Sequence, residues 1–216
     1  TPARKGQDMK TSPTSPGPAS SDATQAKLDQ LVADIDTGGR SPAGLTARVL
    51  TVTAVCWSLF QLWYASPLPF MLGFGVLNDT EARAIHLGFA IFLAYLAYPA
   101  LKSSPRNRIP PQDWLFALVG AFCASYLFWF YGALAQRPGQ PTTLDLVSGI
   151  VGFVLLLEAT RRALGLPMVI VALVFVGYSF GGQYMPEAIM HRGASLTKFV
   201  NHQWLTTEGV FGIALG

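Results

Sequence analysis

Apolar residues gather in five long stretches that are separated by short polar segments. The stretches are Val49–Ala65, Ala84–Leu101, Trp114–Gln136, Leu144–Ala159 and Ala163–Met185. Each approaches the roughly 20 residues with which an α-helix crosses about 30 Å of hydrocarbon. Lipid offers the backbone no hydrogen-bonding partner, so only helices and closed barrels survive there, and runs of this length favour helices. The pattern therefore predicts an all-α, polytopic membrane protein that is dissolved in a lipid bilayer.

Two further apolar segments are not ordinary spans. Ser66–Leu77 is apolar but contains two prolines and is too short to cross, so we expect it to lie in the outer membrane interface or to dip back into it. Within Glu187–Gly209, four apolar residues have the spacing of an amphipathic helix that lies in the plane of the membrane: Leu196, Phe199, Val200 and Trp204.

The first 44 residues differ from the rest of the chain and are predicted to form a cytoplasmic tail. Residues 1–22 are rich in Ser, Pro, Thr and Gly and are expected to be disordered. A short amphipathic helix then follows, because Leu28, Leu31, Val32 and Ile35 recur at helical spacing before Gly38 and Gly39.

Composition and charge agree with a membrane location. Hydrophobic residues make up 51% of the 216 positions and charged residues only 12%, about half the charged share of a soluble domain. The formal net charge is +3. Because the basic residues lie in short segments beside the spans, they orient helices, and a nucleic-acid partner is not expected.

The distribution of basic residues predicts the topology. Six of them precede the first span, and the following segments contain one, three, one, two and two. The first, third and fifth segments together hold eleven of the fifteen Lys and Arg residues. Excess Lys and Arg mark the cytoplasmic side, so the N-terminus is predicted to be cytoplasmic and the first four spans to begin and end there.

One carboxylate lies well inside a predicted span. Glu158 precedes Arg161 and Arg162 by three and four residues, the spacing at which helical side chains pair. A carboxylate in a membrane is also a candidate for ion or proton coupling. The sequence leaves two interpretations open, a structural pair or lipid-headgroup contact on the one hand and coupling on the other.

The remaining candidate residues lie near span ends. His86 either titrates near neutral pH or bonds a neighbouring helix. Arg137 opens a turn before Thr142 and Asp145, which form a capping-box pattern. His191 and Arg192 either shape an outer loop or meet an external partner, since their surroundings lack the ligand spacing of a metal site.

No nucleophile motif, phosphate-binding glycine loop or pair of catalytic carboxylates is recognisable. Cys56 and Cys123 lie inside apolar runs and are expected to pack as small hydrophobic residues. We therefore expect no enzyme activity, cofactor or metal in this chain.

Several strings, in this order and spacing, resemble a known transporter family. They are LVADIDTGGR, ARAIHLGFAIFLAYLAYP, RPGQPTTLDLVSGIVGFVLLLEATRRALG, YSFGGQYMPEAIMHRGASL and TTEGVFGIALG. Together they resemble the N-terminal part of fused permeases of tripartite ATP-independent periplasmic (TRAP) transporters, of the 4TM/12TM type that works with TAXI-class binding proteins. The resemblance extends over about residues 28–216.

The resemblance implies a division of the chain. After the tail of residues 1–44, residues 45–164 would be a four-helix Q-like scaffold, 165–186 a connecting transmembrane helix, and 187–216 the start of a truncated M-like transport unit. The family's solute and sodium sites would then lie beyond Gly216, so no transport-site residue is carried over.

The resemblance also implies a function and partners. We expect a sodium-driven importer of small organic acids in a bacterial inner membrane, supplied by a periplasmic solute-binding protein. The lipid bilayer and the missing M-like portion would be its other partners. The alternative is a non-transporting membrane anchor or sensor whose tail carries a signal.

Overall fold

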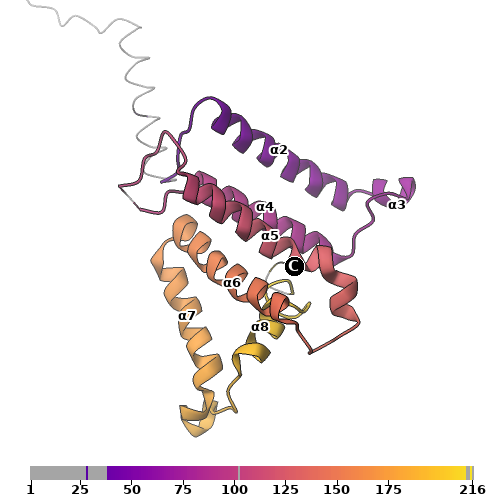
Figure 1. Cartoon of the computed structure of the whole chain (residues 1–216), viewed down its shortest axis with the longest axis vertical. Helices are drawn as coiled ribbons and strands as arrows, with labels where there is room; N and C mark the ends of the chain where they lie inside the picture. Colours follow the sequence, from indigo (N-terminus) through magenta and orange to yellow (C-terminus); the bar gives the residue numbers. More distant parts are fainter. Residues whose placement is uncertain (1–27, 29–37, 102, 213–214, 216) are drawn as a thin grey trace, which may run out of the picture. The chain divides into compact units, whose positions relative to one another are not determined.

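The computed structural model describes residues 28, 38–101, 103–212 and 215. Contacts divide the chain into two compact units, residues 1–38 and 39–216. In the first unit Leu28 is helical and exposed, and the other predictions for the tail lie outside the described residues. The fold and the candidate sites below concern the second unit (Figure 1).

The described part of the second unit is all helical, as the sequence predicts. Its helices are α2 (Leu45–Ala65), α3 (Leu68–Leu72), α4 (Asp79–Ala97), α5 (Pro111–Ala135), α6 (Thr143–Leu164), α7 (Leu166–Gly181) and α8 (Leu196–Trp204). Two 3₁₀ turns, Gly182–Tyr184 and Glu187–Ile189, lie between α7 and α8.

Among the described residues, four helices are long and apolar enough to span a membrane. They are α2, α5, α6, and α7 taken together with its following turn to Tyr184. The chain is therefore a multi-pass helical membrane protein. The predicted span Ala84–Leu101 corresponds to α4, which is not one of the four. Its helix begins earlier than expected, because Asn78 and Glu81 form a capping box, and its first turns are charged.

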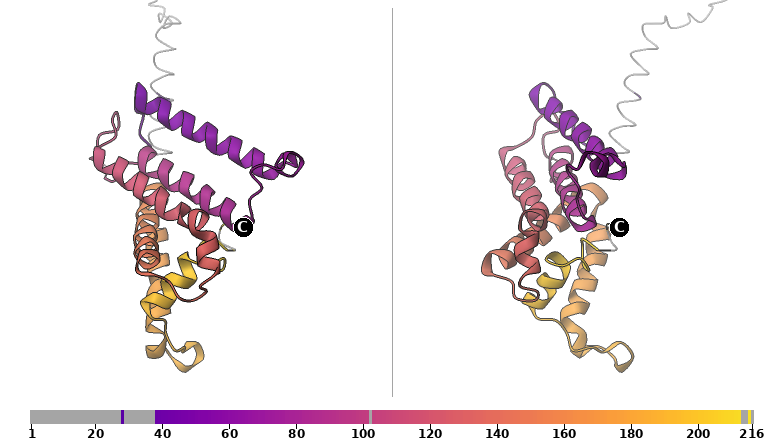
Figure 2. Two further views of the ribbon diagram at one scale, coloured as in Figure 1. Left: turned by 45° about the vertical axis from the view of Figure 1, so that its right-hand side comes forward. Right: turned by 90° about the vertical axis from the view of Figure 1, so that its right-hand side faces the viewer.

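Helix α4 lies at the centre of the unit. It packs on α2, α5 and α6, and eight of its residues are buried. Helices α7 and α8 both lie against α6 (Figures 1 and 2). The largest fully buried side chains include Tyr95 of α4, Trp204 of α8 and Phe211, so the core extends from α4 to the segment after α8.

Helix α8 is the predicted amphipathic helix, but protein covers most of its apolar face. Phe199, Val200 and Trp204 are buried, and the Trp204 indole Nε1 donates to the Cys123 carbonyl at 3.0 Å. A Cβ at Gly149 or Gly152 of α6 would overlap Val200 or Trp204. The two glycines thus let α8 approach α6 closely, and of the four predicted apolar positions only Leu196, which is 55% exposed, remains open to the surroundings.

Other helices expose their apolar surface. None of the 21 residues of α2 is buried, and Val52, Leu59 and Leu62 are more than half exposed. In α7 only Val169 is buried. The short α3, within the segment predicted to be too short to cross, exposes Phe70 and other large apolar residues. Apolar surface of this extent requires an apolar surrounding such as lipid.

The junction between α6 and α7 differs from the sequence expectation. The predicted fourth span ends at Ala159, whereas α6 continues to Leu164. Gly165, with a φ of 89°, separates the helices, and Pro167 lies in the first turn of α7. Because of this extension, Glu158, Arg161 and Arg162 all belong to the last turns of α6.

Candidate functional site

One end of the unit, which we call the basic end, is where α2 begins, α4 ends, α5 begins and α6 ends. Asp113, in the first turn of α5, is fully buried there. Its carboxylate pairs with Arg40 and, at 2.9 Å, with Nη1 of Arg162. Both arginine side chains are also buried, with exposed fractions of 0% and 2%. A buried carboxylate thus joins a guanidinium before α2 to one at the end of α6.

Glu158 continues this network on its more exposed side. Its carboxylate accepts hydrogen bonds from Nε and Nη2 of Arg161 at 2.6 and 2.7 Å, and from Nε of Arg162 at 2.8 Å. The pairing that the spacing predicts is therefore present. Arg162 bridges Glu158 and Asp113, so two carboxylates hold three guanidinium groups and the network has a net charge of +1.

Backbone carbonyls at the end of α4 complete the network. Arg40 donates through Nη1 to the carbonyls of Tyr95 and Leu96 at 3.1 and 3.3 Å, and Arg161 donates through Nη2 to the Ala100 carbonyl at 2.8 Å. The Arg162 guanidinium lies 4.5 Å from the centre of the Tyr95 ring. Since carbonyls at a helix end otherwise lack partners, Arg40 caps α4 while it binds α5, and Arg161 ties the segment after α4 to α6.

Sequence reasoning missed Arg40 and Asp113. Asp113 directly precedes the predicted span that starts at Trp114, and its partner Arg40 is 73 residues away. One signal was present, because Pro110-Pro111 followed by Asp113 is typical of a helix start with an acidic first turn. That signal places Asp113 in α5 but does not reveal its partner.

His86 connects α4 to α2. Its Nδ1 accepts a hydrogen bond from Nε1 of Trp57 at 3.2 Å, and the Gln61 amide also contacts it. The Trp57 ring packs edge-on against the imidazole, with 5.0 Å between ring centres. The expected bond to a neighbouring helix is therefore present.

The opposite end of the unit contains a second buried carboxylate. Asp145 is fully buried and forms the predicted capping box with Thr142. It also accepts a hydrogen bond from the Tyr126 hydroxyl at 2.6 Å and pairs with Arg137 at 3.1 Å. Arg137, whose side chain is 29% exposed, thus fixes the turn between α5 and α6.

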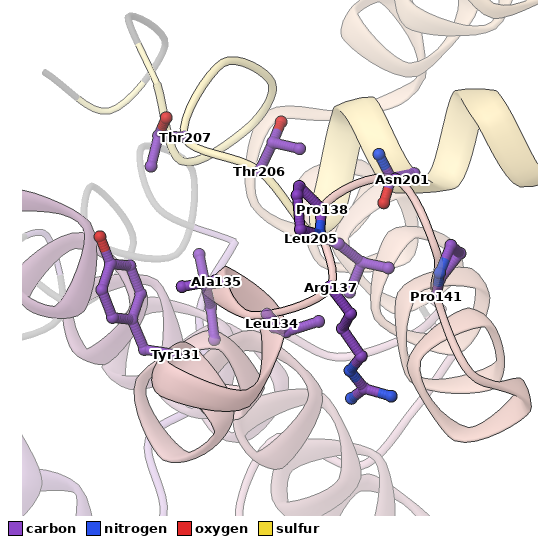
Figure 3. Close-up of a pocket in the computed structure, with 12 residues that line it drawn as sticks. Tyr131, Leu134, Ala135, Arg137, Pro138, Pro141, Asn201, Leu205, Thr206 and Thr207 are labelled. Carbon is purple, nitrogen blue, oxygen red and sulfur yellow. The ribbon is translucent and has the colours of Figure 1, made fainter.

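A cleft of about 210 Å³ lies beside this turn (Figure 3). It is lined by Leu127, Tyr131, Leu134, Ala135, Arg137, Pro138, Gly139, Pro141, Asn201, Leu205, Thr206 and Thr207. In Figure 3 the Arg137 side chain points away from Thr206 and Thr207. Its guanidinium is directed to Asp145, so it does not converge with these hydroxyls on a bound group.

His191 fastens the loop after α7. Its Nε2 lies 3.1 Å from the Tyr178 carbonyl oxygen, and its Nδ1 accepts from the Gly193 amide at 3.1 Å. Its ring packs directly on Gly182, where a Cβ would overlap it. The loop is therefore held against the end of α7, and the neighbouring Arg192 is exposed.

The structure brings together only part of the predicted set. Glu158, Arg161 and Arg162 form one network, whereas His86, Arg137 and His191 each belong to a separate local cluster. Within the described residues, no group of three or more His, Cys, Asp or Glu side chains could hold a metal ion.

Comparison of this chain with protein-family models, with curated proteins and with solved structures finds no match.

Proposed function

We propose that this chain is the scaffold part of a secondary membrane permease of the TRAP type. It would hold a stationary surface for a moving transport unit, in an importer driven by sodium that takes up small organic acids. This proposal combines the resemblance described above with the architecture of the basic end.

The basic end is the observation that carries the proposal. Arg40 and Asp113 join the segment before α2 to α5, and Arg162 joins α5 to α6. Three helices, α4, α5 and α6, are thereby fastened at one end to the segment before α2, and Arg40 also caps α4. Such ties favour a single rigid arrangement, which suits a stationary part better than a moving one.

The opposite end supports a second part of the proposal, a docking surface for a periplasmic solute-binding protein. The turn of residues 137–143 is fixed by the Arg137–Asp145 pair, and the segment of residues 187–202 contains the loop that His191 holds in place. Together with residues 66–79 they present fixed polar and apolar groups. Their rigidity would lower the entropy lost when a partner binds.

Reconstitution tests the proposed function. The full-length protein in proteoliposomes should accumulate small organic acids only with an inward sodium gradient and a TAXI-class binding protein. Loss of uptake when either component is omitted is the expected result. A protein that binds no such partner and supports no uptake would contradict the proposal and favour the membrane anchor or sensor.

Arg192 offers the sharper test of docking. Because it is exposed, Arg192→Glu should weaken the affinity for the binding protein without unfolding the scaffold. Arg137 is a poor choice, since its substitution would also leave Asp145 buried without its cation. Arg108→Glu is the matched control, an exposed arginine at the basic end. Equal affinity of the Arg192→Glu protein and the unaltered protein would argue against docking on this loop.

A further inference from the structure

The basic end has more positive than negative charge. Its described basic residues outnumber its acidic ones by four: Arg40, Arg48, Arg106, Arg108, Arg161 and Arg162 against Asp113 and Glu158. The two carboxylates already accept hydrogen bonds from Arg40, Arg161 and Arg162. They cannot also neutralise the outward-facing cations Arg48 and Arg108, which are both exposed.

Arg161 is held in a fixed position at the edge of this end. Its Nε and Nη2 are bonded to Glu158, and its Nη2 also donates to the Ala100 carbonyl. The side chain is nevertheless 30% exposed, and these bonds leave both hydrogens of Nη1 unengaged. A guanidinium fixed in this way loses little further entropy when it binds a phosphate oxygen.

Apolar side chains adjoin this fixed cation. Leu101 follows Ala100 directly and is 63% exposed, and Leu164 and Leu166 at the α6–α7 junction are 66% and 60% exposed. The site thus has the two parts of a phospholipid-binding site, which are cations for the headgroup and an apolar surface beside them for the acyl chains. Basic pockets at the cytoplasmic ends of transmembrane helices bind anionic headgroups in this manner.

We propose that the basic end binds the phosphodiester of an anionic phospholipid. Arg161 makes the fixed contact, Arg108 on the adjacent loop adds a second positive charge, and the leucines meet the acyl chains. The occupant is a lipid of the surrounding bilayer, and the inference does not depend on the transported solute or on the TRAP assignment.

The test measures lipid binding to the full-length protein in a neutral detergent. Thermal unfolding is followed by tryptophan fluorescence while a short-chain phosphatidylglycerol, the matching phosphatidylcholine, or inorganic phosphate is titrated. Phosphatidylglycerol should raise the unfolding midpoint at a concentration at which the other two have no effect. Native mass spectrometry should show the same lipid retained.

Variants assign the site. Arg108→Gln should weaken the phosphatidylglycerol response about fivefold, the effect of one juxtamembrane cation. Arg161→Lys keeps the positive charge but loses the planar guanidinium with its several donors. It should weaken the phosphatidylglycerol response at least as much as Arg108→Gln does. Arg192→Gln removes an exposed arginine at the opposite end, so it should leave the phosphatidylglycerol response unchanged.

Three results would overturn the proposal. The first is an equal response to phosphatidylcholine. The second is an equal response to inorganic phosphate, which would indicate an anion site without lipid selectivity. The third is a weakening of the phosphatidylglycerol response in Arg192→Gln as large as that in Arg108→Gln. Because Arg108 is exposed and makes no hydrogen bond or ion pair with a described residue, we expect the Arg108→Gln protein to fold, so a lost response reports on lipid binding.

Discussion

Asp113 is the residue on which the basic end depends most, because it is the buried partner of two buried arginines. Replacement of Asp113 by Asn would leave Arg40 and Arg162 without that negative charge. Breaking a buried pair in this way typically costs about 3–5 kcal/mol. We therefore expect Asp113→Asn to lower the unfolding midpoint in detergent strongly, as measured by tryptophan fluorescence.

Glu187→Gln is the matched control for this prediction. Glu187 is exposed, and its substitution should change the stability by less than about 0.5 kcal/mol. If the Asp113→Asn and Glu187→Gln proteins unfold at the same temperature, the network does not hold the helices as described.

Substitution of Glu158 distinguishes its structural role from a role in ion or proton coupling. Its carboxylate is about one third exposed and is fully engaged by Arg161 and Arg162. We expect Glu158→Gln to lower the folding yield and, in the uptake assay that tests the proposed function, to leave the rate per folded molecule unchanged. Loss of uptake at normal yield would instead assign Glu158 a role in ion or proton coupling.

Local pairs could be predicted at the level of residues, but distant ones could not. The Glu158–Arg161 and Glu158–Arg162 pairs and the Thr142–Asp145 capping box follow from helical spacing alone. The partners of Asp113 depend on how α5 and α6 pack and on the course of the segment before α2. One sequence contains no direct signal for these contacts.

At the level of elements, the contact of α6 with α8 depends on small residues. A Cβ at Gly152 would overlap the Trp204 ring and lie 3.0 Å from the Cys123 Cβ. Gly152→Ala should therefore destabilise the protein by about 1–3 kcal/mol, the usual cost of overpacking a core. Thermal unfolding of the purified variant measures this loss.

Gly132→Ala serves as its control within α5. A Cβ there meets nothing within 4 Å, so the better helix propensity of Ala should leave the stability unchanged or raise it by up to about 1 kcal/mol. Should Gly152→Ala prove as stable as Gly132→Ala, α8 does not pack on α6 as the structure describes.

The sequence located the helices well but not their surroundings. Five apolar runs and two shorter apolar segments correspond to α2–α8, and the strong period of residues 196–204 predicted α8. Periodicity identifies an apolar face without telling whether lipid or protein covers it. For Val200 and Trp204 of α8 the cover is protein, because two glycines of α6 make room for these side chains. The fourth apolar run was ended too early, at Ala159, because Arg161 and Arg162 interrupt the apolar pattern, whereas α6 continues to Leu164 and Gly165 ends it.

At the scale of the whole unit, the account depends on helices dissolved in lipid. Helix α2 has no buried residue and α7 has one, so neither has enough protein contact to cover its apolar side chains. The four candidate spans agree with a multi-pass membrane protein, whereas α4, the second of the five predicted spans, is not among them. The orientation itself stays a prediction.

Cysteine labelling from each side of the membrane tests this central claim most directly. In a background with Cys56 replaced by Ser, Asn107→Cys at the basic end and Gln140→Cys at the opposite end place single exposed thiols without changing any charge. In intact cells, a reagent that cannot cross the membrane should label position 140 but not position 107, and lysis should make position 107 reactive. Labelling of both positions from the same side would contradict the account.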